Sequence, residues 1–327
     1  MLSSPTGTPS SPRRSTAPSA GPSPSPILTA TRSPSTTVSE AGTLVFGATG
    51  ALGRHFLDAL GARDIKPDTI TAAGRNQLRL GELASAGFRT AAVDLADSAA
   101  VAELVARHSD IVLISGRDPD RLAQHESVIE AAAKSANVRH VYYTSGVRTD
   151  DDRFAINADH RATEEALTAS GATYTILRNT WYIENYIQAL AGPRFTGVLA
   201  AATGDAVVAA ASRKDLAEAL AVVATTDGHD NVTYSLSGDT DFTYADIAEA
   251  MSVVLEREVT YRPVAPEELQ AALVSSGMDS GLARFLVSLD ETIAAGVFAR
   301  VGDDLSRLLG RPTTGLVEGL TAEWSRD

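Results

Sequence analysis

The sequence predicts an α/β protein that has one doubly wound parallel sheet and a smaller C-terminal α/β lobe. From residue 43 onward, short apolar runs alternate with helical stretches, which is the pattern of strands joined by helical crossovers. The run at residues 111–114 is apolar at every position, as expected for a central strand that helices cover on both faces. Right-handed crossovers between such strands give a single parallel sheet.

Six apolar runs are predicted to be strands of this sheet: residues 43–46, 69–73, 89–93, 111–114, 140–144 and 174–177. The helices predicted between them include residues 52–60, 99–107, 121–136 and 156–170. The elements predicted after about residue 178 are strands 206–211 and 232–236, helices 214–225 and 243–255, a mostly helical segment 267–295, a loop 310–314 and a last helix 316–324. We interpret this second half as a lobe over the carboxyl ends of the strands, where open α/β sheets bind ligands.

Residues 1–40 form a Ser/Pro/Thr-rich tail that we expect to be disordered. Eight of the 14 prolines lie there, aromatic residues are absent, and the first carboxylate of the chain is Glu40. Such a segment buries too little apolar surface to offset the entropy of ordering it. An export signal would need an apolar segment after Arg13 and Arg14, and the residues that follow them form no such segment. A transit peptide is a weaker alternative than a plain extension. We therefore expect a cytoplasmic protein.

The composition excludes several classes of function. The chain has 28 Lys and Arg against 41 Asp and Glu, and a formal net charge of −13 disfavours nucleic acid or an anionic membrane as a partner. The absence of cysteine excludes disulfides, thiolate metal sites and thiol catalysis. The six histidines show no ligand spacing, so we expect no metal, and no apolar run is long enough to span a membrane.

A glycine-rich turn directly follows the first predicted strand and opens a helix. Glycines three residues apart allow a sharp turn off the strand, a close approach of the backbone to a pyrophosphate, and tight packing of the helix on the sheet. The N-terminus of the helix adds free N–H groups and a partial positive charge. The turn therefore predicts a Rossmann-type dinucleotide site formed by Gly47, Ala48, Thr49, Gly50, Ala51, Leu52 and Gly53.

The end of the second strand indicates which dinucleotide binds. NAD-specific sites carry a carboxylate there, whereas this chain has Arg75 and no carboxylate before Glu82. An arginine can pair with a 2′-phosphate, so we predict NADPH as the cofactor, with weaker binding of NADH. Asp94 after the third strand is expected near the adenine, and the turn Ser115-Gly116 near the nicotinamide half. We accordingly predict an NAD(P)-binding domain at 41–178 and a smaller substrate-binding lobe at 179–327.

These motifs, together with Tyr143-Thr-Ser145 and the longer motif Arg178-Asn-x-Trp-Tyr-x-Glu-Asn-Tyr186, resemble the NmrA-like, atypical short-chain dehydrogenases/reductases. Within this group the chain is most similar to type 2 NAD(P)H:quinone oxidoreductases, and nearly as similar to triphenylmethane-dye reductases. The resemblance implies an NADPH-dependent reductase without flavin. It also implies further cofactor contacts at Thr144, Asn179, Trp181, Tyr182 and Arg213.

The candidate catalytic residues lie on one predicted helix and near the ends of two predicted strands. No tyrosine is followed four residues later by lysine, so the usual short-chain dehydrogenase acid is absent. His160 and Glu164 lie one helical turn apart, and a carboxylate beside imidazole favours the charged ring. The reduced acceptor needs a hydrogen-bond donor for its oxyanion, and our candidates are His160, Tyr143 and Asn179.

The predicted function is hydride transfer from NADPH to a quinone or a similar flat aromatic acceptor. Trp181, Tyr182 and Tyr186 follow the sixth strand, where such an acceptor can stack, although packing between the lobes explains Trp181 and Tyr186 equally well. An azo or triphenylmethane dye is the alternative acceptor. A redox-sensing regulator that binds NADP(H) without turnover is the alternative function, and the sequence leaves the oligomeric state open.

Overall fold

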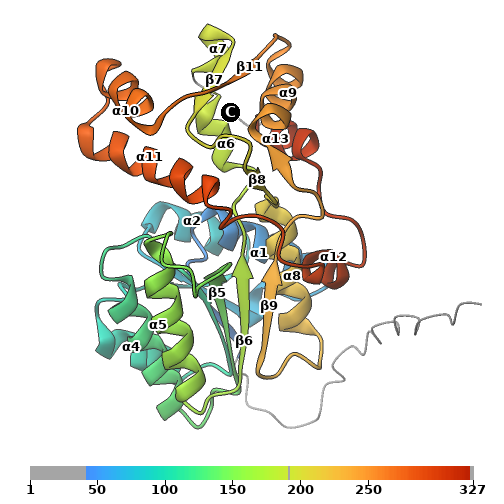
Figure 1. The fold of residues 1–327 in the computed structure, drawn as a ribbon. Helices are drawn as coiled ribbons and strands as arrows, with labels where there is room; N and C mark the ends of the chain where they lie inside the picture. Colours follow the sequence, from blue (N-terminus) through green and yellow to red (C-terminus); the bar gives the residue numbers. More distant parts are fainter. Residues whose placement is uncertain (1–41, 191, 325–327) are drawn as a thin grey trace, which may run out of the picture. The chain divides into compact units, whose positions relative to one another are not determined.

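The protein is described from a computed structural model, which covers residues 42–190 and 192–324. Seven parallel strands form the main sheet in the spatial order β3-β2-β1-β4-β5-β6-β9 (Figure 1). In that order their bounds are β3 (Arg89–Ala92), β2 (Ile70–Gly74), β1 (Thr43–Phe46), β4 (Asp110–Ile114), β5 (His140–Gly146), β6 (Tyr174–Asn179) and β9 (Val232–Leu236). The direction in which strands are added reverses between β1 and β4, which is the switch point where such sheets bind ligands.

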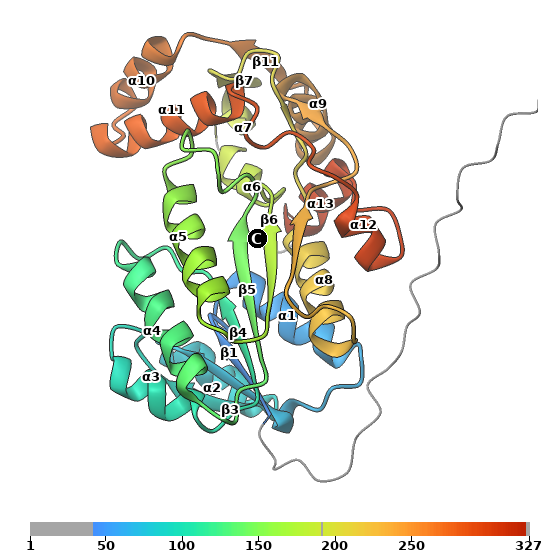
Figure 2. The same ribbon diagram turned by 60° about the horizontal axis from the view of Figure 1, so that its bottom comes forward.

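Helices cover both faces of this sheet, as Figure 2 shows from a second direction. One face packs against α1 (Ala51–Gly61), α8 (Arg213–Thr225) and α12 (Asp304–Leu309). The other packs against α3 (Ser98–Val105), α4 (Arg121–Lys134) and α5 (Ile156–Ala169). A short 3-10 turn (Pro67–Thr69) precedes β2, and α2 (Gln77–Ser85) packs beside β2 and β3. All five residues of β4 are buried, because side chains on both of its faces meet helices.

A second group of elements lies beyond the carboxyl ends of β5, β6 and β9 (Figures 1 and 2). Its helices are α6 (Asn185–Ala189), α7 (Pro193–Thr196), α9 (Tyr244–Leu255), α10 (Pro266–Ser275), α11 (Ser280–Ala294) and α13 (Leu316–Trp324). Its strands form two pairs, β7 (Val198–Ala201) with β11 (Thr260–Pro263) and β8 (Val207–Val208) with β10 (Phe242–Thr243). Most of these elements pack around a separate apolar core that includes Ile247, Met251 and Leu320, whereas α10 packs on α11 in a smaller cluster with Leu269 and Val287.

The predicted fold class is confirmed, and two predictions about the second half need correction. The strand predicted at 206–211 contracts to β8, because only two of its residues find a partner strand, β10. The strand predicted at 232–236 has the right bounds, but it pairs with β6 in the main sheet rather than within the smaller lobe. Helix α8 likewise covers the main sheet, so the chain returns to the first layer after residue 178. The division into domains at that residue remains a prediction.

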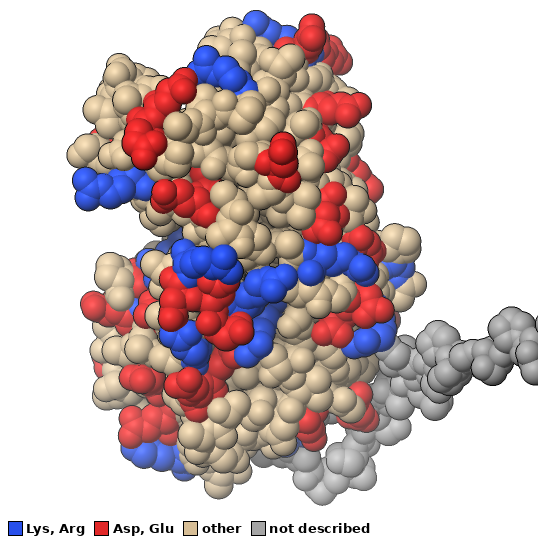
Figure 3. Space-filling model, in the orientation of Figure 1, with Lys and Arg blue, Asp and Glu red and all other residues tan. Residues whose placement is uncertain are grey.

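Charged side chains of both signs are interspersed over the surface. On the face that Figure 3 displays, basic residues gather across the middle, and acidic residues lie above and below them. Within the part of the chain that the structure describes, no helix combines the length and apolar character needed to cross a bilayer. Among the same residues, His, Asp and Glu side chains nowhere form a group of three that would hold a metal ion.

Asp215 ties the segment before the last helix to the main sheet layer. It lies in the first turn of α8, and its carboxylate is fully buried. The carboxylate accepts hydrogen bonds from the Arg311 guanidinium (2.8 Å), from the backbone N–H of Thr314 (2.6 Å) and from the Thr314 hydroxyl (3.1 Å). One buried carboxylate therefore binds the chain at both Arg311 and Thr314.

We expect Asp215→Ala to lower the free energy of unfolding by about 2–4 kcal/mol, because it leaves the N–H and hydroxyl of Thr314 without their acceptor and removes the buried carboxylate that pairs with Arg311. Glu218 pairs with the same guanidinium at 2.5 Å but is 35% exposed, so Glu218→Ala is the matched control and should cost less than about 1 kcal/mol. Urea unfolding of the three proteins measures both values. Equal losses for the two variants would contradict the anchoring role of Asp215.

Candidate active site

The glycine turn brings the N-terminus of α1 to the edge of the sheet. Gly47 has φ +81°, a conformation that side chains disfavour. A Cβ on Gly53 would lie 2.3 Å from the Gly47 carbonyl oxygen, so only glycine allows the helix to pack this closely on the turn. Gly50 precedes the helix and supplies no side-chain cap, which leaves the N–H groups of the first turn available. The turn thus has the features that bind a pyrophosphate.

The predicted cofactor residues follow one another along the carboxyl edge of the sheet. Arg75 comes directly after β2, the glycine turn after β1, Ser115 and Gly116 after β4, and Asn179 ends β6. The order β2-β1-β4-β5-β6 places them side by side across five neighbouring strands. A Cβ on Gly74 would meet the Thr49 hydroxyl at 2.8 Å, so the end of β2 also packs tightly on the turn.

Arg75 lies where the prediction placed it, with an ion-pair partner that the sequence did not indicate. Its guanidinium Nη2 donates to both carboxylate oxygens of Asp118, at 2.9 and 3.2 Å. The Arg75 side chain is 58% exposed and that of Asp118 33%. Asp94, predicted near the adenine, is exposed after β3, and its carboxylate accepts from the N–H of Ala96 at 3.0 Å.

Beyond the paired ends of β4 and β5, the Thr144 side chain binds the turn that follows β4. The backbone N–H of Ser115 donates to the Thr144 hydroxyl at 2.9 Å, and Thr144 is buried. The Thr144 side chain therefore fixes the turn of Ser115 and Gly116. This places Thr144 beside the predicted nicotinamide position, as a residue that orients the neighbouring strand end.

The segment after β6 brings polar and aromatic side chains together. The Asn179 side chain is buried, and its carbonyl oxygen Oδ1 has no hydrogen-bond partner among the described residues. The indole N–H of Trp181 is also buried without a partner there. The Tyr182 ring lies beneath the Arg213 guanidinium, 4.9 Å from its centroid, and Arg213 donates to Asn185 at 2.9 Å. Unpaired buried polar groups at a strand end indicate a position where a ligand supplies the missing partner.

Aromatic residues from three separate segments meet above this strand end. The ring of Phe298 lies 5.1 Å from Trp181 and 5.2 Å from Phe154, between centroids. Phe298 is buried in the core of the smaller lobe, and so is Tyr186, which packs against Tyr244 with centroids 6.0 Å apart. Sequence analysis missed Phe154 and Phe298, because single aromatic residues in loops carry no periodic pattern.

His160 and Tyr143 are hydrogen-bonded to each other in the interior of the protein. The Tyr143 hydroxyl lies 2.8 Å from Nδ1 of His160, and both side chains are buried between the sheet and α5. Burial, reinforced by the neighbouring His125, lowers the pKa of His160 to about 4. Burial also raises the pKa of Tyr143. The expectation of a charged imidazole is therefore wrong, and His160 is neutral at neutral pH.

Glu164 does not serve as the partner of His160. Its carboxylate accepts from the Arg178 guanidinium at 2.5 and 2.9 Å and from the Ser145 hydroxyl at 2.6 Å. The same ion pair raises the pKa of Arg178. Glu164 therefore joins the ends of β5 and β6 to α5. Glu164 lies on the helix face that the spacing predicted. Its carboxylate, however, accepts hydrogen bonds from Arg178 and Ser145 of the strands and not from His160.

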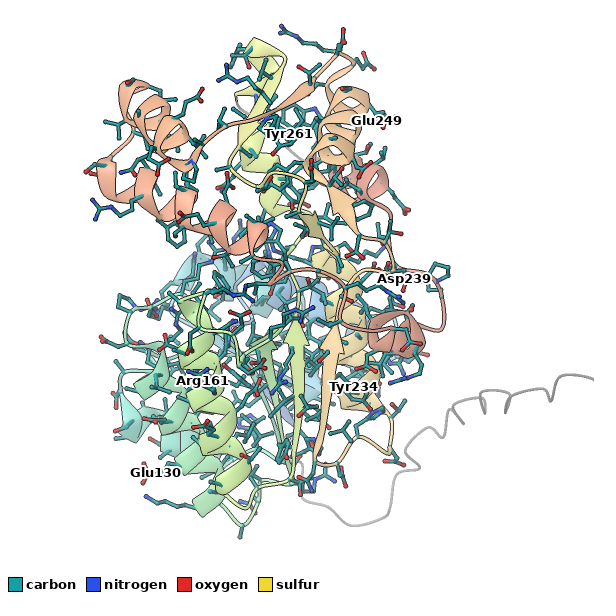
Figure 4. The ribbon with its side chains drawn as sticks, viewed as in Figure 1. Glu130, Arg161, Tyr234, Asp239, Glu249 and Tyr261 are labelled. Atoms are coloured by element: carbon teal, nitrogen blue, oxygen red, sulfur yellow. The ribbon has the colours of Figure 1, made fainter. Side chains whose placement is uncertain are left out.

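Arg148 is a cation near the same strand ends that sequence analysis missed. Its backbone has φ +51°, a strained conformation for arginine, and its carbonyl oxygen accepts from Asn157 at 2.8 Å. The neighbouring arginines 153, 161 and 178 each pair with a carboxylate (Arg161 is labelled in Figure 4). No ion pair among the described residues involves Arg148, and its buried Nε has no hydrogen-bond partner there.

A parallel sheet whose switch point carries a glycine turn and an uncapped helix N-terminus defines a dinucleotide-binding protein of Rossmann type. The NAD(P)H-binding family matches residues 47–227, more than half of the chain. This protein belongs to that family.

Sequence relatives narrow the class to oxidoreductases. Quinone oxidoreductase 2 of Escherichia coli (strain K12) is 34% identical over 278 residues, which are 85% of this chain and 96% of the relative. An NAD(P)H azoreductase of Xenophilus azovorans is 24% identical over 276 residues, 84% of this chain and 95% of the relative. The resemblance to quinone oxidoreductases inferred from the motifs is confirmed.

Solved structures agree with these relatives. The crystal structure of the Escherichia coli NADPH-dependent quinone oxidoreductase, complexed with NADPH, has a TM-score of 0.81 at 33% identity. It covers 86% of this chain and 99% of its own. A triphenylmethane reductase from Citrobacter sp. has a TM-score of 0.81 at 28% identity, with 87% and 99% covered. The chain is thus homologous to a quinone oxidoreductase and related to reductases of dyes.

We expect stability to depend on pH through His160. The unfolded chain binds a proton on this residue below about pH 6.5, whereas the folded protein does so only near pH 4. The free energy of unfolding therefore falls by up to about 3 kcal/mol as the pH drops through this window. His160→Gln keeps a hydrogen-bonding group for Tyr143 and removes this part of the decline. Urea unfolding at pH 7.0, 5.5 and 4.5 measures the difference, and identical pH dependence in both proteins would contradict a buried neutral imidazole.

Proposed function

We propose that this protein is an NADPH-dependent reductase that transfers hydride to a quinone or a similar flat aromatic acceptor. The observation that carries the proposal is the conjunction of an uncapped helix N-terminus with a guanidinium at the neighbouring strand end. An anionic dinucleotide fits both groups, because free N–H groups bind pyrophosphate and arginine binds a 2′-phosphate. The homology to an NADPH-dependent quinone oxidoreductase supports the same assignment.

The cofactor fits the residues at this edge. Residues 47–53 would hold the pyrophosphate, Arg75 the 2′-phosphate, and Ser115 and Gly116 the nicotinamide half. Close packing at Gly53 and Gly74 shapes a turn that side chains would fill. The reduced nicotinamide supplies hydride when bound, and the acceptor's carbonyl oxygen becomes an oxyanion that needs a donor. No metal or flavin is part of the proposal.

The acceptor would lie over the ends of β5 and β6. Trp181 and Phe154 are partly exposed and offer an apolar surface for a flat ring, and the buried Phe298 supports both of them from the core of the smaller lobe. Two donors suit the oxyanion. The Arg148 guanidinium has no ion-pair partner among the described residues, and the Asn179 Nδ2 makes only a long hydrogen bond of 3.5 Å to the Tyr182 hydroxyl. His160 and Tyr143 are hydrogen-bonded to each other, and this bond connects β5 to α5. We therefore assign both residues a positioning role.

Steady-state turnover tests the proposal. The purified full chain is mixed with NADPH or NADH and with a simple benzoquinone, a naphthoquinone, an azo dye and a triphenylmethane dye, and absorbance at the reduced nicotinamide band is followed. We expect oxidation of NADPH with at least one acceptor, and slower oxidation of NADH. Binding of NADPH without turnover on every acceptor would contradict the reductase and favour a regulator that only binds the dinucleotide.

We expect Arg148→Met to lower kcat by about 10- to 100-fold with a smaller change in KM, because a donor aimed at developing charge acts mainly in the transition state. Arg153→Met is the matched control. Arg153 lies in the same loop, is 59% exposed and pairs with Asp151, so the control should keep kcat within about twofold. Equal kcat for wild type and Arg148→Met would remove Arg148 from the proposed chemistry.

A further inference from the structure

We propose that Asp118 is a residue that determines cofactor specificity, because its carboxylate competes with the cofactor's 2′-phosphate for Arg75. The inference rests on the proposed function, in which Arg75 binds that phosphate. In this proposal Asp118 lowers the affinity for NADPH and thereby reduces the preference for NADPH over NADH.

The ion pair spans the place where the dinucleotide would lie. Arg75 follows β2 and Asp118 follows β4, and in the sheet these two strands lie on opposite sides of β1. The bond between their side chains therefore crosses the end of β1, where the glycine turn begins. Both hydrogen bonds of the Arg75 guanidinium within the described residues run to Asp118, at 2.9 and 3.2 Å.

Both hydrogen bonds to Asp118 come from Nη2, the nitrogen that a guanidinium uses in either of its two bidentate contacts, with Nη1 or with Nε. A 2′-phosphate that binds Arg75 bidentately needs Nη2 and carries about two negative charges, so it cannot make this contact while Asp118 remains in place. After displacement, the carboxylate stays close to the phosphate and repels it. NADH carries a 2′-hydroxyl instead, and Asp118 can accept a hydrogen bond from that hydroxyl, as acidic residues do in NAD-specific sites.

The segment that holds Asp118 can release its side chain without disturbing the core. Residues 115–120 belong to no helix or strand, and the Asp118 carboxylate is one-third exposed. The backbone carbonyl of Asp118 accepts from the N–H of Arg121 at 3.1 Å, which holds the main chain while the side chain rotates. Since the ion pair is partly exposed, its effect on binding is moderate.

Equilibrium titration of the full chain with NADPH and with NADH, followed by nicotinamide fluorescence, tests the inference. For Asp118→Asn we expect the Kd of NADPH to fall by about 2- to 10-fold and the Kd of NADH to stay equal or rise. Asp120→Asn is the matched control, because it removes the same charge two residues away, from a side chain that caps nothing and is exposed. In an Arg75→Gln background the gain from Asp118→Asn should shrink, since there is no guanidinium left to release.

Unchanged NADPH binding by Asp118→Asn would overturn the inference, since it would mean that Asp118 does not compete for Arg75. Weaker NADPH binding would also overturn it, since it would mean that Asp118 holds Arg75 in its binding orientation. An equal gain in Asp120→Asn would also overturn it, because the effect would then be one of overall charge. A wild-type chain that binds neither coenzyme would contradict the proposed function itself, so the two failures are distinguishable.

Discussion

The site depends on one packing constraint, the close contact between the first turn of α1 and the glycine turn that precedes it. The Gly47 carbonyl oxygen lies where a Cβ of Gly53 would be, so the helix can approach the end of β1 only without that atom. The approach directs free N–H groups toward the edge of the sheet at its switch point. The strand order arranges the predicted cofactor residues at the ends of β2, β4, β5 and β6 along the same edge, next to this turn.

A second layer of interactions holds the strand ends in place beneath the site. The pair Tyr143–His160 and the group formed by Glu164, Arg178 and Ser145 connect β5 and β6 to α5. These side chains are buried, apart from the partly exposed Arg178, and are hydrogen-bonded to one another, which suits a supporting role. Buried polar atoms without a hydrogen-bond partner among the described residues occur on Asn179, Thr180 and Trp181, which follow one another at the carboxyl end of β6. Three consecutive residues with such atoms are the physical reason for placing the acceptor there.

The sheet could be predicted from the sequence because its central strands are apolar on both faces, and their bounds shift by only a few residues in the structure. Strand β9 shows the limit, since its residues form a strand in any arrangement and only long-range pairing with β6 places it in the main sheet. His160 shows another limit. The spacing placed His160 and Glu164 on one helical face. Burial, however, lowers the pKa of His160, and Arg178 pairs with the Glu164 carboxylate in its place. Asp118 and Arg148 are single charged residues in loops, and no pattern in the sequence distinguishes them from solvated ones.

The claim on which the account depends is that the edge formed by the glycine turn and Arg75 holds one NADPH per chain. Isothermal titration calorimetry of the full chain with NADPH measures this directly, with Gly50→Glu as the comparison, because a carboxylate at the helix N-terminus would repel the pyrophosphate. The account predicts saturable binding at one equivalent per wild-type chain and at least tenfold weaker binding by a folded Gly50→Glu variant. Equal affinity in the two proteins, or no heat of binding in the wild type, would contradict it.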